Sequence, residues 1–404
     1  MAIFNKKNKT DSNSFLSLDI GTEFVKVLNC NITDDNIEIL GFGKERQPLN
    51  AMKGGIVTNI GSVVTSCRKA IEQSLDSSEY PSKVVLGIAG ELVKGINIKV
   101  NYERDDPESK IDEIEIKKIL DKLHDTAYQE ATKKFEDMTG SKDTEIKLIN
   151  ATITDTFIDN YRVSTPLNFQ GKKVSINVFF VYTPLIIKGA LDDILKQLEL
   201  TPIIIAVQPF AISRTIKGSR DNNFDAIIID VGGGTTDIAL INGGIFQDTK
   251  MFAMGGRSFT KRVSKDLSLP YNDAENIKIE YSEMNLDKAT NLRVKDAIKK
   301  DLDLWISGVE ISLEEIENIK TYPDQILLCG GGSKLPDIRS KLIEYPWSVV
   351  LPFHRTPKIN FLSPDKIDGI IDKTFQLTRP EDVPVVSLAR IVLDIYKDEV
   401  IIAL

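Results

Sequence analysis

Short runs of β-branched and other apolar residues, separated by glycine-rich turns, recur along the 404-residue chain. In "DAIIIDVGGGTTDIALINGG" (225–244), the apolar runs on both sides of the glycines predict two buried strands. "NGG" predicts a hairpin turn into a third strand, "IFQDTKMFAM". The glycines therefore lie between two strands, whereas the common phosphate loops lead into a helix. No lysine follows them, which excludes a Walker A motif.

The same pattern occurs near the N-terminus, in "FLSLDIGTEFVKVLN" (15–29). Asp19-Ile-Gly21 repeats Asp230-Val-Gly232, each between predicted strands. Two similar halves, each with a glycine turn led by an aspartate, predict a ligand clamped between them, since clefts between domains are preferred ligand sites.

A glycine turn of this kind can hold a phosphate, because successive backbone N–H groups converge on an anion when no side chain intervenes. Thr235 and Thr236 add hydroxyl donors. An aspartate beside a phosphate would repel it unless a divalent cation lies between them, so Asp230 is a candidate magnesium partner through water. The alternative for each turn, taken singly, is an ordinary hairpin that uses glycine for positive φ.

A third glycine cluster follows an apolar run in "ILLCGGGSKLPDIRSKL" (326–342). The pattern predicts a strand, a turn at Gly330–Gly332, and a helix with Ser333 as its N-cap. The glycines would let a flat group such as adenine or ribose approach the backbone. A plain strand-to-helix loop is the alternative.

Helical periodicity marks two long segments. The first, "DEIEIKKILDKLHDTAYQEATKKFEDM" (112–138), predicts an amphipathic helix within an α+β insert. The second, "RVKDAIKKDLDLWISGVEISLEEIENI" (293–319), predicts the longest helix of a charged, helix-rich region. Near its start lie four basic residues, which form either a solvated face or a surface for an acidic peptide. These candidate partner-binding residues are Arg293, Lys295, Lys299 and Lys300.

Composition narrows the classes of protein. A net charge of −8 argues against nucleic-acid binding. The three cysteines lie far apart in the sequence, which indicates a reduced, cytosolic chain, and two histidines cannot form a metal cluster. No apolar run approaches the ~20 residues of a membrane-spanning helix. The lysine-rich start is either a disordered tail (1–13) or a weak membrane contact through Phe4.

The three glycine motifs, in this order, resemble those of the actin-like ATPase superfamily. "LDIGTEFVK" resembles its first phosphate loop, "IDVGGGTTDIAL" its second, and "LLCGGGSKLPDI" its adenosine motif. "VQPFAISRTI" resembles the connecting helix, with Gln208 at the place of the residue that positions water. The resemblance implies an α/β, ribonuclease H-like fold with two lobes and duplicated halves, and ATP with Mg²⁺ in the cleft between them.

A finer resemblance, over nearly the whole chain, is to the FtsA family of bacterial division proteins. "AMKGGIVTNIGSVVTSCRKAIEQS", "VVLGIAGELVKG" and "TDTFIDNYRVSTPLNFQGKKVSINVFFVYTP" resemble the FtsA glycine turn with its helix and the two ends of subdomain 1C. The implied subdomains are 1A (14–83, 183–206 and 378–397), 1C (84–182), 2A (207–257 and 323–377) and 2B (258–322).

The resemblance also implies roles for individual residues. Gln208 would place the attacking water, and Asp19 and Asp230 would orient a hydrated Mg²⁺. Glu275 and Lys278 match residues that approach the nucleoside, although both also suit a plain helix face. Lys26 matches a phosphate-contacting lysine unless it points to solvent. The candidate ATP-binding residues are Gly21, Thr22, Glu23, Lys26, Gly232, Gly233, Gly234, Thr235, Thr236, Gly256, Glu275, Lys278, Gly330, Gly331, Gly332, Ser333 and Leu335.

Three functions are compatible with these motifs. The first is an FtsA-like adaptor that binds the C-terminal peptide of FtsZ, forms filaments and hydrolyses ATP slowly or not at all. The second is a PilM-like pilus-assembly protein that binds a peptide of a membrane partner. The third is a small-molecule kinase, which is disfavoured because no catalytic aspartate base is evident and the 1C-like insert is present.

The FtsA resemblance also implies a location at the inner face of the cell membrane at the division site. FtsA normally ends in a basic amphipathic helix, whereas this sequence ends in "KDEVIIAL". We therefore expect the membrane contact to be indirect or through a short tail.

Overall fold

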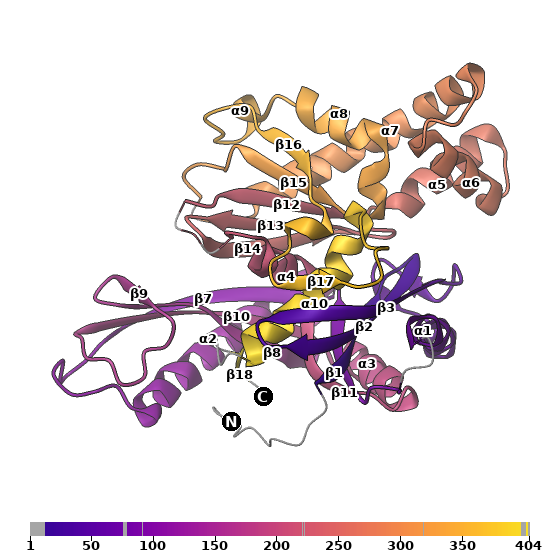
Figure 1. The fold of residues 1–404 in the computed structure, drawn as a ribbon. Helices are drawn as coiled ribbons and strands as arrows, with labels where there is room; N and C mark the ends of the chain where they lie inside the picture. The colour runs from indigo at the N-terminus through magenta and orange to yellow at the C-terminus, as the bar shows by residue number, and fades with distance from the viewer. Residues whose placement is uncertain are drawn as a thin grey trace.

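The computed structural model describes residues 13–75, 79–90, 92–219, 221, 223–317, 319–396 and 401–402. The predicted tail at 1–13 lies outside these residues except for Asn13. Two lobes lie one above the other, and an elongated insert extends from the lower lobe (Figure 1). None of the described helices combines the length and the hydropathy that crossing a membrane requires.

A six-stranded sheet forms the lower lobe, in the order β11-β6-β1-β2-β3-β17. Three antiparallel strands from one continuous segment are followed by β6 and β11, which run parallel to β1. Helices α1 (Ile60–Leu75) and α3 (Leu185–Gln197) bury their apolar faces against this sheet. Its strands are β1 (Ser14–Ile20), β2 (Phe24–Thr33), β3 (Asn36–Arg46), β6 (Lys83–Ile88), β11 (Thr201–Val207) and β17 (Ile370–Asp372).

A five-stranded sheet forms the upper lobe, in the order β14-β13-β12-β15-β16. Again, three antiparallel strands from one segment are followed by two parallel strands. Its strands are β12 (Ala226–Val231), β13 (Thr236–Asn242), β14 (Ile245–Phe252), β15 (Gln325–Cys329) and β16 (Lys358–Phe361). Apart from β17, both sheets share one strand order and one set of directions, so the structure shows the duplicated halves that the repeated motif predicted.

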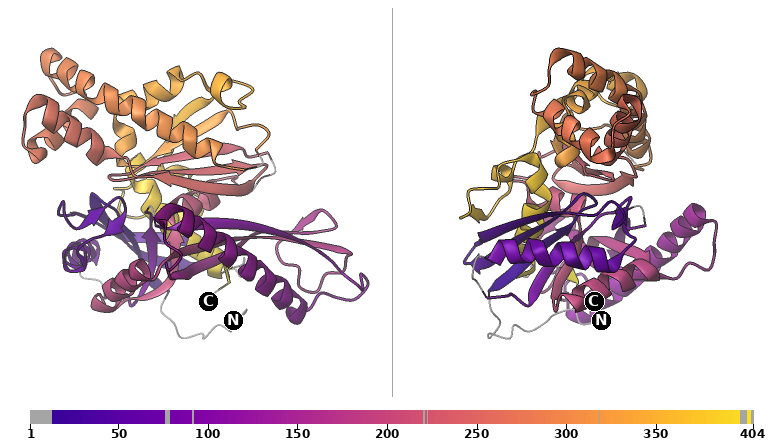
Figure 2. Two further views of the ribbon diagram at one scale, coloured as in Figure 1. Left: turned by 180° about the vertical axis from the view of Figure 1, so that it is seen from behind. Right: turned by 90° about the vertical axis from the view of Figure 1, so that its right-hand side faces the viewer.

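Helices cover the outer face of the upper sheet (Figure 2). Trp305 of α7 and Phe259 of α5 are fully buried there, in one cluster with β12 and β15. These helices are α5 (Gly256–Leu267), α6 (Tyr271–Ser282), α7 (Lys288–Glu314), α8 (Pro336–Glu344) and α9 (Trp347–Val350). Helix α7 begins after its N-cap, Asp287, whose carboxylate accepts from the N–H groups of Ala289 and Thr290.

Two helices, α4 (Gln208–Thr215) and α10 (Val383–Tyr396), lie between the two sheets. One apolar cluster contains Phe15 of the lower sheet, Ile228 of the upper sheet, Phe210 of α4 and Val385 of α10. The two sheets and the two helices between them therefore share one continuous core.

The insert is an α+β unit built on β7 (Lys94–Glu103), β8 (Ile146–Ile158) and β10 (Lys173–Pro184). Strands β9 (Tyr161–Val163) and β18 (Ile401–Ile402) pair with β8. The predicted amphipathic helix is α2 (Glu113–Thr139), capped by Asp112 and ended by Gly140 in the left-handed conformation. Its apolar face forms a separate core with the insert strands.

Two predicted subdomain boundaries differ from the strand pairing. Strand β6 (83–88) belongs to the lower sheet, because it pairs with β1 and β11, so the insert begins after it rather than at residue 84. Strand β17 (370–372) pairs with β3 of the lower sheet, although the predicted upper lobe includes 323–377. A lone strand that joins a distant sheet leaves no local signal in the sequence. A further two-stranded hairpin consists of β4 (Met52–Lys53) and β5 (Ile56–Val57).

Candidate functional site

The two glycine turns are closed by equivalent hydrogen bonds. In the first, the N–H of Gly21 donates to the Phe24 carbonyl at 3.1 Å; in the second, the N–H of Gly232 donates to the Thr235 carbonyl at 2.9 Å. Asp19 and Asp230 occupy matching places in their hairpins. In each hairpin the aspartate belongs to the cross-strand residue pair that is second from the turn. The duplication therefore gives each lobe one turn led by one aspartate.

A cleft of about 300 Å³ lies between the turns. It is lined by residues of both lobes and of the segments that join them. The predicted residues that line it are Asp19, Gly21, Thr22, Glu23, Lys26, Gln208, Asp230, Gly232, Gly233, Thr235, Gly256, Glu275, Lys278, Gly330, Gly331, Gly332 and Leu335. The structure thus brings together residues from three glycine motifs and the connecting helix, although they are far apart in the sequence.

Two predicted residues of the second glycine motif do not line the cleft. Gly234 packs against the first turn, where an added Cβ would lie 2.8 Å from the Thr22 Oγ1 atom. Thr236 is fully buried, and its hydroxyl donates to the Met254 carbonyl at 2.7 Å. Thr236 therefore supports the second turn from inside the lobe, whereas Gly234 lies where the second turn meets the first.

Ser333 does not line the cleft either, and its predicted role as a helix N-cap is wrong. It lies in a 3-10 turn, Gly331–Lys334, with its hydroxyl donating to the Gly330 carbonyl at 2.7 Å. Helix α8 begins later, at Pro336, and its N-cap is Leu335. The hydroxyl is used inside the turn and is not available to the helix.

The two turns touch each other across the cleft. An added Cβ at Gly233 would lie 2.7 Å from the Glu23 Cβ atom, so only glycine allows this approach. Among the described residues, the backbone N–H groups of Thr22, Gly233 and Gly234 have no protein acceptor, whereas that of Gly21 is used within its own turn. Free N–H groups at the meeting point of two turns form an anion-binding cradle, which fits a phosphate group.

Three buried carboxylates lie at the base of the cleft. Burial raises the pKa of Asp19 to about 6, although the charge of Lys26 acts in the opposite direction. Burial, together with the charges of Asp237 and Asp19, raises the pKa of Asp230 to about 8. Burial also raises the pKa of Asp237 to about 7. Each carboxylate would be stabilised by a cation, which fits a divalent metal held beside a phosphate.

No group of three or more His, Cys, Asp or Glu side chains that could hold a metal ion directly occurs in the part of the chain that the structure describes. Contact of Asp19 and Asp230 with Mg²⁺ through water stays a prediction.

Gln208 and Lys26 both lie near the first aspartate. The side-chain amide of Gln208, the first residue of α4, donates to the Asp19 carboxylate. Lys26 is directly opposite Asp19 in the strand register and is buried rather than pointing to solvent. Its Nζ atom donates to the Glu381 carbonyl and lies 3.4 Å from the Asp382 carboxylate.

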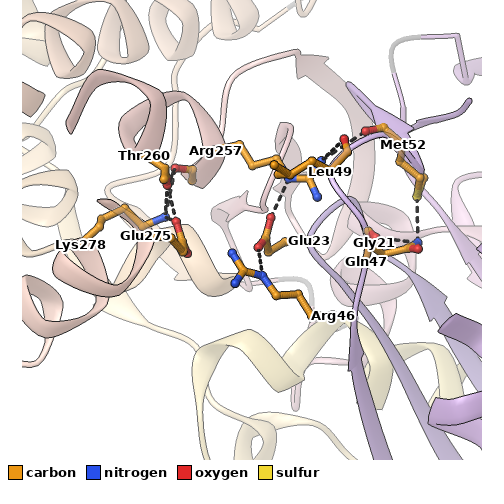
Figure 3. Close-up of polar contacts among 11 residues, drawn as sticks. Gly21, Glu23, Arg46, Gln47, Leu49, Met52, Arg257, Thr260, Glu275 and Lys278 are labelled. Atoms are coloured by element: carbon orange, nitrogen blue, oxygen red, sulfur yellow. Dashed lines mark hydrogen bonds and ion pairs between the residues drawn. The ribbon is translucent and has the colours of Figure 1, made fainter. Parts of the chain in front are cut away.

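Glu275 and Lys278 form a buried ion pair at another part of the cleft, with 2.7 Å between Lys278 Nζ and Glu275 Oε2 (Figure 3). Lys278 also donates to the Gly256 carbonyl at 3.1 Å and to the Thr260 hydroxyl at 2.8 Å. Both residues line the cleft, so neither lies on a solvated helix face.

Sequence reasoning missed several cleft residues. Asp237 ends the glycine motif and lies opposite Asp230 in the strand register, as Lys26 lies opposite Asp19 in the first lobe. The repeated motif could therefore have indicated Asp237 as a cleft residue. Arg257 directly follows the predicted Gly256 but was not predicted as a site residue, because its contacts are visible only in the folded chain.

Glu381 is a further cleft residue without a signal in the sequence. It contacts Lys44 and Lys334, each at 3.1 Å. Burial would raise the pKa of Glu381, but the charges of the surrounding lysines lower it to about 2. Its carboxylate therefore stays ionised and holds these lysines at the edge of the cleft.

The four basic residues of α7 lie outside this site. Arg293, Lys295, Lys299 and Lys300 are all exposed and none lines the cleft. They are available to a partner on the outer surface of the upper lobe.

Comparisons with known proteins agree with this architecture. A family model described as cell division protein FtsA matches residues 227–360. FtsA of Neisseria meningitidis is 28% identical over 273 residues, which cover 67% of this chain and 62% of that protein. FtsA of Bacillus subtilis is 25% identical over 352 residues, which cover 81% of this chain and 75% of that protein. The match thus spans less than two thirds of the Neisseria protein.

Among solved structures, a chain of the PilM–PilN type IV pilus biogenesis complex matches with a TM-score of 0.66 and 18% identity. The match covers 93% of this chain and 97% of that chain. The chain therefore has the actin-like fold, which confirms the predicted fold class. Within proteins of this fold, its sequence is similar to FtsA, which confirms the resemblance carried by the motifs.

Proposed function

We propose that this chain binds ATP with Mg²⁺ between its two glycine turns and acts as an FtsA-like protein of bacterial cell division. The observation that carries the proposal is the meeting of the two turns, with free N–H groups at Thr22, Gly233 and Gly234, above buried carboxylates. A triphosphate needs N–H donors and a cation, and this cleft offers places for both.

Each part of the cleft has a role in this proposal. The free N–H groups hold phosphate oxygens, and Asp19 and Asp230 accept hydrogen bonds from water around the metal. The bound Mg²⁺ would offset the negative charge of the phosphates. The glycines at 330–332 and the Glu275–Lys278 pair, which also line the cleft, would contact the adenosine.

Hydrolysis in this cleft would be slow. Gln208 is a neutral amide, so it can orient a water molecule but cannot act as a strong base. Its link to Asp19 fixes the amide beside the first turn. Catalysis would then depend on positioning and on stabilisation of charge. Weak ATPase activity suits a protein in which nucleotide controls assembly or partner affinity.

The similarity to FtsA supports a role at the division site, on the cytoplasmic face of the membrane. In this role the protein would self-associate into filaments and bind the C-terminal peptide of FtsZ. The exposed basic residues of α7 provide a surface that complements an acidic peptide.

Titration calorimetry with ATP, with and without Mg²⁺, tests nucleotide binding. We expect saturable binding that Mg²⁺ strengthens. The proposal would be refuted if a protein that circular dichroism shows to be folded gave no heat of binding at millimolar ATP.

A PilM-like role is the second candidate, because the structural match to the PilM–PilN complex extends over nearly the full length of both chains. Binding assays with two peptides separate the candidates. Binding of an FtsZ C-terminal peptide supports the division role, whereas binding of a PilN N-terminal peptide in its place supports the pilus role.

A further inference from the structure

Arg257, the second residue of α5 in the upper lobe, reaches across to the lower lobe (Figure 3). Its Nε atom lies 2.6 Å from the Glu23 Oε2 atom of the first turn. Its Nη1 atom donates to the carbonyls of Leu49 at 3.3 Å and Met52 at 3.2 Å. One guanidinium therefore contacts two separate segments of the opposite lobe.

The Glu23–Arg257 pair is largely shielded from water, with side-chain exposures of 12% and 11%. The second carboxylate oxygen of Glu23 accepts from Arg46 Nε at 2.7 Å. Arg46 lies on β3, in the same lobe as Glu23, and its side chain is 38% exposed. Of these two arginines, only Arg257 joins one lobe to the other.

The backbone of Arg257 is bonded to the second turn. Its N–H donates to the Gly233 carbonyl at 2.7 Å, and the N–H of Gly256 donates to the Gly232 carbonyl at 2.9 Å. Arg257 thus holds the second turn through its backbone and the first turn through its side chain. Any separation of the turns must break contacts of this one residue.

Both partners also line the cleft. Opening the lobes would separate a shielded ion pair and leave each charge without its partner until water replaced it, which is unfavourable. In addition, the two guanidiniums neutralise a carboxylate that would otherwise repel a phosphate beside the first turn.

We infer that the Glu23–Arg257 ion pair is a latch that holds the lobes closed over the cleft and limits the rate at which nucleotide leaves. The inference rests on the proposed ATP site for its effect on nucleotide, but the closure itself can be measured without nucleotide. Arg257 acts here as a positioning residue, through the two turns.

The test compares Arg257→Gln with Arg46→Gln. Both remove a guanidinium from Glu23, but only the first removes the link between lobes. Release of a fluorescent mant-ATP is followed by stopped flow after a chase with excess ATP. We expect Arg257→Gln to speed release about tenfold or more, because loss of one partner of a buried pair acts mainly on the dissociation rate. Arg46→Gln should change it by less than about twofold.

Hydrogen exchange in the ligand-free protein provides the second measurement. The bonded N–H groups of Gly21, Gly232 and Arg257 should exchange faster in Arg257→Gln than in the wild type or Arg46→Gln. Glu23→Gln breaks the same pair from the other side and should reproduce both effects, which guards against misfolding of one variant.

Two results would overturn the latch. The first is that Arg257→Gln releases mant-ATP and exchanges its N–H groups at the wild-type rates. The second is that Arg46→Gln changes both rates as much as Arg257→Gln does, which would show that the charge on Glu23 matters rather than the link between the lobes. If the wild type fails to bind mant-ATP, the proposed function is refuted. The hydrogen-exchange rates of the ligand-free protein still decide whether the ion pair holds the lobes closed.

Discussion

The side-chain amide of Gln208 donates a hydrogen bond to the carboxylate of Asp19, although 189 residues separate them in the sequence. This contact joins the start of α4 to the first glycine turn. Because α4 lies in the core between the two sheets, the contact also links the cleft to the interior of the molecule.

Replacement of Gln208 by alanine should slow ATP hydrolysis without weakening ATP binding. In the proposed site the amide would orient water, and it donates to Asp19 rather than contacting the free N–H groups that would hold the phosphates. We expect single-turnover phosphate release to fall about tenfold or more, while the Kd for ATP changes less than about twofold. Gln197→Ala, on the exposed side of α3, is the control. A collapse of affinity in Gln208→Ala would instead make Gln208 a structural residue.

Replacement of Gly232 by valine should strongly weaken nucleotide binding and leave the fold intact. An added Cβ at this position lies 3.3 Å from the Thr235 carbonyl oxygen, a tight contact that a small shift can relieve, and Gly232 lines the cleft, so a larger side chain there is expected to hinder approach of a ligand to the turn. ATP affinity should fall by at least about tenfold, the effect of losing about 1.4 kcal/mol. Gly189→Val is the control, because a Cβ there meets nothing within 4 Å. Unchanged affinity would refute the second phosphate turn.

Replacement of Asp230 by asparagine should stabilise the ligand-free protein at alkaline pH. The folded pKa of about 8 lies above the ordinary value of 3.8, so between these values the folded chain holds a proton that the unfolded chain releases. The stability of the wild type should therefore fall as the pH rises through this window. Because asparagine does not titrate, the unfolding free energy of Asp230→Asn should exceed that of the wild type by roughly 1–3 kcal/mol at alkaline pH.

Urea unfolding at acidic, neutral and mildly alkaline pH measures this difference. The advantage of Asp230→Asn should grow with pH, and Mg²⁺ should no longer strengthen its ATP binding. A difference in unfolding free energy that does not vary with pH would show that Asp230 does not retain its proton in the fold.

Reversal of charge on α7 should weaken binding of an acidic partner peptide. Glutamate at Lys295, Lys299 and Lys300 replaces attraction to the peptide with repulsion, so the remaining binding should no longer weaken as salt is added. Fluorescence anisotropy with an FtsZ C-terminal peptide measures this. The matched control places glutamate at three lysines that are exposed on α2 of the insert, Lys117, Lys118 and Lys122. Equal losses in both variants would point to general charge effects.

The repeated Asp-x-Gly pattern predicted the duplicated sheets, because a strand, a glycine turn and a second strand are encoded locally. It also brought together Asp19, Asp230 and the two turns of the cleft, whereas Gln208, Glu275, Lys278 and the glycines at 330–332 were predicted from the third glycine motif and from the family resemblance. The role of Ser333 as an N-cap was wrong, since the glycines before it allow a tight 3-10 turn that the helix pattern does not reveal.

The contacts that cross between lobes could not be predicted from the sequence. Arg257 and Glu381 are single charged residues, and charged residues are usually solvated. Their partners, Glu23 and Lys334, lie in segments that are distant in the sequence and meet only in the folded chain. Strand β17 is a similar case, because its three residues pair with a strand more than three hundred positions away.

A crystal structure with Mg²⁺ and a non-hydrolysable ATP analogue tests the central claim most directly. We predict the triphosphate between the two turns, bonded to the N–H groups of Gly233 and Gly234, with hydrated Mg²⁺ facing Asp19 and Asp230. A cleft without nucleotide at saturating concentration, or nucleotide bound elsewhere on the chain, would contradict this account.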